Sequence, residues 1–152
     1  MGKNVVFLIN KSEITAGTRG ASLGPDAIIT AARKKESYIF GENEVDEIWI
    51  TFPDPQIKYK RTKHRMTNSE FLQLYKKILK KDGVVNLKTD SEFMHGYTLG
   101  LLHGEGHEVL YANHNVYVNE GSPEEVTAFQ TFYEKQYLEI NKAITYIRFK
   151  IK

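Results

Sequence analysis

Short apolar runs alternate with amphipathic segments along this chain. Runs rich in β-branched and aromatic residues, ended by Gly, Pro or polar positions, predict strands, and they fall at 4–9, 46–52, 84–88, 107–112 and 143–150. Apolar residues at helical spacing predict helices, at about 25–35, 67–83, 91–103 and 124–138. Strands that alternate with helices in this way favour an α/β fold with a parallel sheet.

Local signals support these boundaries. Thr67 and Glu70 have the spacing of a capping box at the start of the second helix, and Gly83 is placed to end it. Pro25 suits the first turn of the first helix. Trp49 lies in the middle of a predicted strand, so we expect its side chain in the core.

Two acids come directly after strands. Asp54 lies just past the strand at 46–52, and Asp90 lies just past the strand at 84–88. In open α/β sheets the working residues gather beyond the carboxyl ends of the strands. We therefore expect both carboxylates at one functional edge of the sheet.

Composition narrows the class of protein. The chain has 152 residues, enough for one domain with a real core, and it is 41% hydrophobic and 26% charged. No stretch has the roughly 18 apolar residues of a membrane span. The sequence has no cysteine, which excludes disulfides, thiolate metal sites and Cys nucleophiles and favours a cytoplasmic protein.

The formal net charge of +2 hides a strong asymmetry along the chain. Residues 58–81 carry nine lysines and arginines against one acid, Glu70. Such a stretch favours a polyanionic partner such as a nucleic acid. The alternative is a solvated loop followed by an ordinary lysine-rich helix face, and charge alone does not choose between the two.

Three motifs carry a resemblance to a known family. They are FPDP at 52–55 with the basic run after it, LKTD at 87–90, and TFYEKQY at 131–137. Together they make residues 44–152 resemble the tRNA (guanine-N7-)-methyltransferase family. The resemblance implies a Rossmann-like methyltransferase-type sheet with flanking helices, S-adenosylmethionine as the cofactor, and tRNA as the partner.

The resemblance also implies roles for particular residues. Asp54 would be catalytic and would lie beside the methyl donor. The substrate would contact Lys58, Asp90, Thr131 and Glu134, and RNA would contact Lys60, Arg61, Lys63, His64 and Arg65. Tyr59 and His64 are also placed to stack on an exposed base. Many members have Trp-Pro after the Asp-Pro, whereas this chain has Gln56-Ile57, a difference that we expect to affect local packing.

Each motif has a simpler structural interpretation. Pro-Asp-Pro is a common turn, and Asp90 is placed to cap the helix that follows it. Thr131 and Glu134 also have the spacing of a helix capping box. The segment His103–His107 suggests a metal site, but its two glycines break the helix that would align the histidines, so we expect a loop and no metal.

The first third of the chain follows a different pattern. The family's acidic donor-binding strand, E-x-G-x-G, is absent from the sequence, and the glycines at 17–24 have the wrong spacing for a dinucleotide turn. Residues 5–41 instead resemble the opening segment of the arginase and agmatinase (ureohydrolase) family, although the metal-binding D-x-H-x-D motif of that family is also absent.

We therefore interpret the chain as one α/β domain over 1–152 that joins two lineages. A ureohydrolase-like segment over 1–43 precedes a methyltransferase-like substrate half over 44–152, and the sheet is shortened in its N-terminal half. The predicted function is methylation of guanine N7 in tRNA, impaired by the missing glycine motif. The alternatives are a non-catalytic RNA-binding remnant and an engineered chimeric fold without activity. An exposed sheet edge also favours a homodimer.

Overall fold

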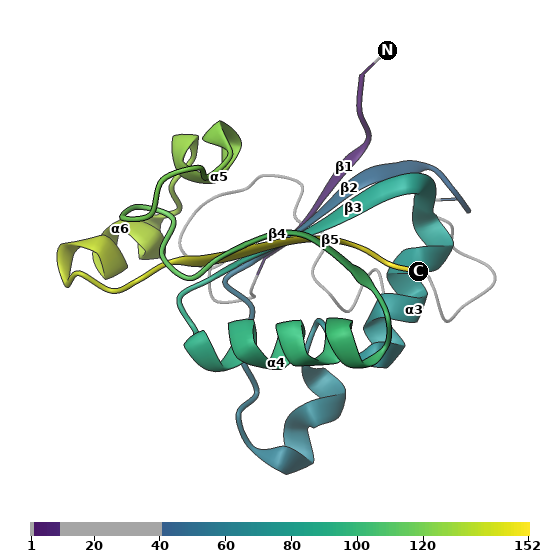
Figure 1. The fold of residues 1–152 in the computed structure, drawn as a ribbon, viewed down its shortest axis with the longest axis horizontal. Coiled ribbons are helices and arrows are strands. Elements are labelled where there is room, and N and C mark those ends of the chain that lie inside the picture. The colour runs from purple at the N-terminus through teal and green to yellow at the C-terminus, as the bar shows by residue number, and fades with distance from the viewer. Residues whose placement is uncertain (1, 10–40) are drawn as a thin grey trace.

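The computed structural model describes residues 2–9 and 41–152, and within them five strands form one sheet (Figure 1). The predicted α/β class is confirmed. The glycine-rich loop and the helix predicted over 25–35 lie outside the described residues. The elements in chain order are β1 (Val5–Ile9), β2 (Val45–Thr51), the 3-10 helix η1 (Tyr59–His64), α3 (Ser69–Ile78), β3 (Leu79–Thr89), α4 (Glu92–Gly104), β4 (Glu108–Asn113), α5 (Glu124–Ala128), α6 (Phe132–Glu139) and β5 (Thr145–Lys150).

The sheet is mixed rather than parallel. Its order is β1-β2-β3-β5-β4, with β1, β2 and β3 parallel and β5 antiparallel to both β3 and β4. The prediction of a parallel sheet is therefore wrong for β5. The connection explains the reversal: α5 and α6 lie beyond the end of the sheet where β4 finishes, so the chain re-enters from that end (Figure 1).

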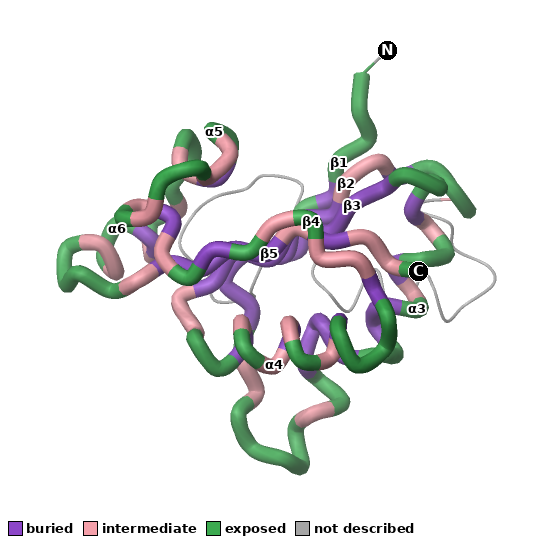
Figure 2. The backbone as a smooth tube through the Cα atoms, viewed as in Figure 1, coloured by how far each residue is buried: buried purple, intermediate pink, exposed green. Residues whose placement is uncertain are grey.

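One face of the sheet packs against α3 and α4. Successive side chains of a strand point to opposite faces, and Ile48, Ile50 and Leu87 point to this one, where each is fully buried. They belong to a large apolar cluster that includes Leu72 and Tyr75 of α3. Figure 1 shows the two helices beneath the sheet, and Figure 2 shows that much of the sheet above them is buried.

A second apolar cluster lies on the other face. It contains Trp49, Phe52, Val116, Val126, Ile144 and Tyr146. Trp49 is only 7% exposed, so its predicted place in the core is confirmed. This cluster joins the carboxyl end of β2 to the α5–α6 region, which brings these two helices to the edge where Asp54 and Asp90 were expected.

The helix predicted over 67–83 is shorter at both ends. Asn68 is the N-cap, because its side chain accepts from the Phe71 backbone N–H at 2.9 Å, while the Thr67 hydroxyl lies 2.7 Å from that of Thr98. The helix ends at Ile78, and Gly83 lies inside β3. The predicted capping box and C-terminal glycine are thus wrong: Asn68 caps the helix in place of Thr67, and the chain enters β3 before it reaches Gly83.

The helix predicted over 124–138 is interrupted. α5 ends at Ala128 and α6 begins at Phe132, with Thr131 as its N-cap. Thr131 and Glu134 form a capping box, so this interpretation of the T-x-x-E motif is confirmed. The bend between the two helices, Phe129–Thr131, is called the α5–α6 elbow below.

Candidate active site at the carboxyl edge of the sheet

The FPDP motif forms a tight turn at the end of β2. The Phe52 N–H donates to the Lys88 carbonyl of β3 at 2.8 Å, which extends the pairing of the two strands by one residue. Phe52 and Gln56 have φ of +47° and +46°, a region that bulky residues rarely adopt. Strained backbone of this kind persists only where the surroundings enforce it, and it occurs preferentially at functional sites.

Asp54 is exposed at the tip of this turn. Its Oδ1 accepts a hydrogen bond from the Gln56 N–H at 2.9 Å, which orients the carboxylate. The turn interpretation and the active-site interpretation are therefore compatible, because one oxygen fixes the side chain while the group as a whole faces solvent.

Asp90 leaves β3 at the same edge, since Thr51 of β2 and Lys88 of β3 are paired in parallel register. It does not cap α4, because the Ser91 side chain accepts from Met94 N–H in that role. Instead, Asp90 Oδ2 lies 2.5 Å from Lys142 Nζ. The hydrogen bond to Asp90 raises the pKa of Lys142.

The basic run after the turn divides into two kinds of residue. Lys58, Lys60, Arg61, Lys63 and His64 are all exposed, and Tyr59 is 90% exposed. They lie on or beside η1, in the exposed segment that projects below α4 (Figure 2). This arrangement leaves the cations and one aromatic ring accessible to a polyanion.

Arg65 differs from these residues because it is buried. Its guanidinium donates to the carbonyls of Gln56 and Ile57, both at 3.2 Å, and lies over the rings of Phe93 and Tyr97 at 4.8 and 4.5 Å. Arg65 thus fixes the loop after the FPDP turn to α4. The sequence predicted an RNA contact for Arg65, and that contact stays a prediction for a guanidinium that already has partners inside the protein.

Glu134 is fully buried and paired inside the protein. Its Oε1 lies 2.6 Å from both Lys88 Nζ and the Tyr117 hydroxyl, and its Oε2 accepts from the Thr131 N–H. Burial lowers the pKa of Lys88, although the contact with Glu134 opposes this effect. Burial, together with the hydrogen bond to Glu134, raises the pKa of Tyr117.

A cavity of about 560 Å³ lies on the face of the sheet that bears Trp49. Thr131 and Glu134 belong to its lining, whereas Asp54, Lys58 and Asp90 do not. The structure therefore brings the predicted site residues to one end of the sheet, where Thr131 and Glu134 face this cavity. The lining residues are Lys3, Val5, Phe7, Glu47, Trp49, Thr51, Phe52, Lys88, Glu125, Phe129, Thr131 and Glu134.

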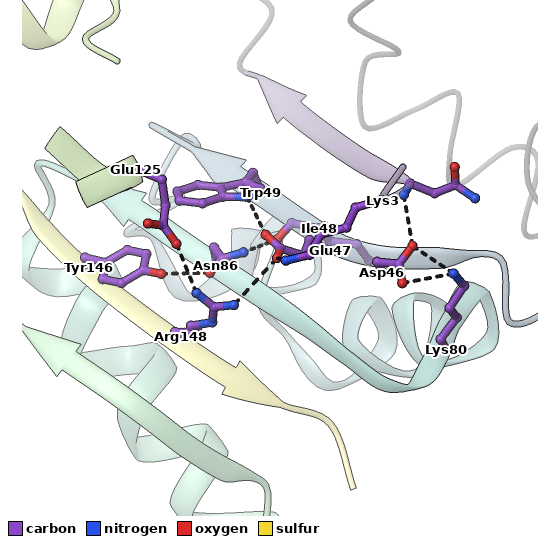
Figure 3. Close-up of polar contacts among 11 residues, drawn as sticks. Lys3, Asp46, Glu47, Ile48, Trp49, Lys80, Asn86, Glu125, Tyr146 and Arg148 are labelled. Atoms are coloured by element: carbon purple, nitrogen blue, oxygen red, sulfur yellow. Dashed lines mark hydrogen bonds and ion pairs between the residues drawn. The ribbon is translucent and has the colours of Figure 1, made fainter. Parts of the chain in front are cut away.

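A polar network beside this cavity joins several strands (Figure 3). The Glu47 carboxylate accepts from Lys3 Nζ at 3.0 Å and from the Trp49 indole N–H at 3.2 Å, and it lies 3.6 Å from Arg148. Arg148 also pairs with Glu125 of α5 at 3.3 Å. Burial raises the pKa of Glu47, but the hydrogen bonds from Lys3 and Trp49 outweigh it and lower that pKa.

Four residues of the site were not predicted from the sequence: Lys88, Tyr117, Lys142 and Arg148. For Lys88 a signal was present, since a lysine inside an apolar strand run must find a partner when it is buried. Tyr117 and Lys142 lie in segments without a motif, and only the fold brings them to Glu134 and Asp90.

The histidine segment is a turn, as predicted. His103 lies in the last turn of α4 and is exposed, whereas His107 is buried and its Nδ1 accepts from the Lys152 N–H. Across residues 2–9 and 41–152, no three metal-ligating side chains come together. In the same residues, no helix has the length and apolar character to cross a membrane.

The α/β fold is that of the methyltransferase class, and comparisons with known proteins agree. The chain belongs to the family described as "Putative methyltransferase", whose model matches residues 28–147. That match begins inside the segment 5–41, where we noted a resemblance to ureohydrolases. A solved SAM-dependent methyltransferase from Archaeoglobus fulgidus has a similar fold, with a TM-score of 0.51 and 11% identity over 99% of this chain and 87% of that one.

Curated relatives are named tRNA (guanine-N(7)-)-methyltransferase. The one from Christiangramia forsetii is 76% identical over 115 residues, which are 76% of this chain and 51% of that protein. The one from Porphyromonas gingivalis is 43% identical over 110 residues, 72% of this chain and 44% of that protein. The chain thus spans about half the length of these relatives.

Proposed function

We propose that this protein is a tRNA (guanine-N7-)-methyltransferase that uses S-adenosylmethionine. One observation carries the proposal: the FPDP turn presents Asp54 at the edge where Asp90 also leaves the sheet, directly before an exposed basic segment. The relatives that share this part of the chain bear the same activity in their names.

The chemistry suits an exposed, oriented carboxylate. Guanine N7 has a free lone pair and no proton, so its methylation needs no general base. Positioning of the reactants supplies most of the rate in such a reaction. The purine ring becomes cationic as the methyl group arrives, and a fixed carboxylate nearby stabilises that charge. We assign this role to Asp54, whose Oδ1 is held by the Gln56 N–H.

We assign substrate binding to Lys58, Asp90 and Thr131. Asp90 would accept from guanine N–H groups, with Lys142 held against it as a counter-ion. Lys60, Arg61, Lys63 and His64 would contact phosphates, since they are exposed on η1. Tyr59 offers an open ring face for stacking.

The methyl donor fits this chain only in part. Asp54 lies where the family resemblance places the donor, and it is exposed and oriented. A methyltransferase of this kind has a glycine-rich acidic motif after its first strand, and the sequence that follows β1, residues 10–40, contains no E-x-G-x-G. S-adenosylmethionine would supply a methyl group bound to a sulfonium, and we assign no further residue to its binding.

That missing motif favours a second candidate function, an RNA-binding module that does not bind the donor. The basic segment on η1 is intact and exposed, so it would bind RNA without any donor site. The two functions differ in one property, donor binding.

Finer expectations from the sequence stay predictions. They are the ureohydrolase-like origin of the N-terminal segment, the cytoplasmic location and the homodimer. Of the described strands, β1 and β4 form the edges of the sheet and would be the places where a second copy pairs.

Calorimetric titration of S-adenosylmethionine into the protein, followed by a methylation assay on tRNA, tests the proposal. We expect micromolar donor binding and N7-methylguanine in the product. Asp54→Ala should abolish methylation and leave tRNA affinity nearly unchanged. A cooperatively folded protein that binds tRNA but not the donor would instead establish the RNA-binding module.

A further inference from the structure

We infer that Lys88 and Tyr117 are positioning residues, which act through the buried Glu134 carboxylate to fix the α5–α6 elbow and the place of Thr131. In this arrangement Glu134 acts from inside the fold, and Thr131 is the residue presented to the substrate. The inference rests on the proposed function for what Thr131 contacts, but the arrangement itself rests on the described contacts alone.

Lys88 connects three parts of the site. Its ammonium lies 2.6 Å from Glu134 and donates to the carbonyls of Val126 and Phe129, at the end of α5. An ammonium has three donors, and these three acceptors match them. The Lys88 backbone carbonyl accepts from Phe52, the first residue of the FPDP turn. One strand residue therefore holds the turn with its backbone and the elbow with its side chain.

The Glu134 carboxylate is occupied on both oxygens. Oε1 accepts from Lys88 and Tyr117, and Oε2 accepts from the Thr131 N–H. The side chain is completely buried. A carboxylate can accept about four hydrogen bonds, and three are already supplied here from inside the protein, which leaves little of this group for a ligand.

Thr131 is the residue that this arrangement presents. Its N–H donates to Glu134 Oε2, and its hydroxyl oxygen accepts from the Glu134 N–H at 3.2 Å. Thr131 is partly exposed and lines the cavity. Its position is therefore set by Glu134, and the position of Glu134 is set by Lys88 and Tyr117.

The decisive measurement is amide hydrogen exchange over residues 124–139, combined with kcat and KM for tRNA. The variants are Tyr117→Phe, which removes one hydroxyl, and Lys88→Met, which removes the buried cation. Lys150→Met is the matched control, because Lys150 of β5 pairs at the protein surface with Asp82 of β3. Such exposed pairs contribute little to stability.

We expect exchange over 124–139 to be about tenfold faster in Tyr117→Phe and about a hundredfold faster in Lys88→Met. Exchange in the control should match the wild type. In both elbow variants kcat should fall while KM for tRNA changes by less than about twofold, because the basic segment still binds RNA. A variant that lost only global stability would exchange faster along the whole chain and would lower the apparent kcat through a smaller folded fraction. We therefore calculate kcat per folded molecule, with the folded fraction measured by circular dichroism.

Exchange in Tyr117→Phe equal to that in the control would overturn the inference, even if Lys88→Met does not fold. Faster exchange with an unchanged kcat would reduce the two residues to a purely structural role and would also overturn it. A wild-type protein that methylates no tRNA would defeat the proposed function, and the exchange data would still decide whether Lys88 and Tyr117 hold the elbow.

Discussion

Arg65 shows how far a single side chain departs from what its sequence neighbourhood indicates. It lies in a run of exposed cations, yet its guanidinium is buried between two carbonyls and two aromatic rings. Its ring partners come from α4, and nothing in the local pattern links the two segments. The exposure of Lys60 and Lys63 was predictable from charge alone, whereas the burial of Arg65 depended on tertiary packing.

Arg65→Lys should destabilise the protein although the charge is kept. A lysine cannot reproduce the forked donation to the carbonyls of Gln56 and Ile57 or the stacking on both rings. We expect the free energy of unfolding to fall by about 1–3 kcal/mol, measured by urea denaturation. Arg61→Lys, at an exposed position on η1, is the control and should change it by less than about 0.5 kcal/mol. Equal effects of the two changes would contradict the role of Arg65.

We expect the protein to lose stability at alkaline pH because the side chain of Tyr146 is buried. Burial raises its pKa to about 12, and its hydroxyl donates to Asn86 Oδ1 at 2.8 Å. The folded state thus keeps a proton that the unfolded chain loses near pH 10. The stability that this group contributes is therefore complete below pH 10 and is lost as the pH rises toward 12.

The variant Tyr146→Phe tests this dependence. It should be about 1–3 kcal/mol less stable than the wild type at neutral pH, because Asn86 loses a buried partner. The difference should narrow between pH 10 and 12, as measured by denaturant unfolding at each pH. A constant difference over that range would show that Tyr146 does not titrate as proposed.

At the scale of elements, the sequence predicted which helices and strands exist better than it predicted where they begin and end. All five strands of the described sheet lie where the apolar runs placed them, and α4 begins after Ser91 as predicted. The end of α3 was missed because Gly83 does not end a helix. It lies in β3, where the irregular register with β2 brings the backbone of Lys80 close. The direction of β5 was missed because a strand run carries no mark of its direction.

Gly83→Ala distinguishes the two interpretations of this glycine. At an exposed helix end the change would be mild, but here a methyl group would lie 2.8 Å from Leu79 Cδ2 and 3.0 Å from the Lys80 carbonyl oxygen. We expect a loss of about 1–3 kcal/mol in the free energy of unfolding from overpacking. Gly100→Ala in α4, where an added methyl group meets nothing within 4 Å, is the control and should be neutral or stabilising.

Over the whole molecule, exposed positive charge gathers on one projecting segment, η1, which would bind RNA in the proposed function. Each phosphate contact by a lysine or arginine should add about 0.7–0.9 to the salt dependence of RNA binding. Lys60→Ala with Lys63→Ala should therefore lower the slope of log K against log salt by about 1.4–1.8. Lys76→Ala with Lys77→Ala removes the same charge from exposed positions on α3 and is the control. Equal slopes for the two double variants would show that the long-range field, and not η1, binds the RNA.

The candidate site could be predicted only where its chemistry is local. The FPDP turn, the basic run and the T-x-x-E capping box are each formed by residues close together in the sequence, and the structure has all three. The ion pair of Lys88 with Glu134 and that of Asp90 with Lys142 join residues more than forty positions apart. Their geometry follows from the mixed sheet, which no local pattern specifies.

The position of β5 has a consequence for synthesis of the protein. This strand is the last described element, yet it lies between β3 and β4, and among the described strands β4 pairs with β5 alone. The sheet cannot be completed while β5, Thr145–Lys150, is still inside the ribosome. The nascent chain therefore carries an unpaired β4 until β5 has emerged. Contacts that form so late and over such separations slow folding and expose the chain to aggregation. We therefore expect chains arrested before Thr145 to be protease-sensitive on the ribosome, and release of the last strand to make them resistant in one step.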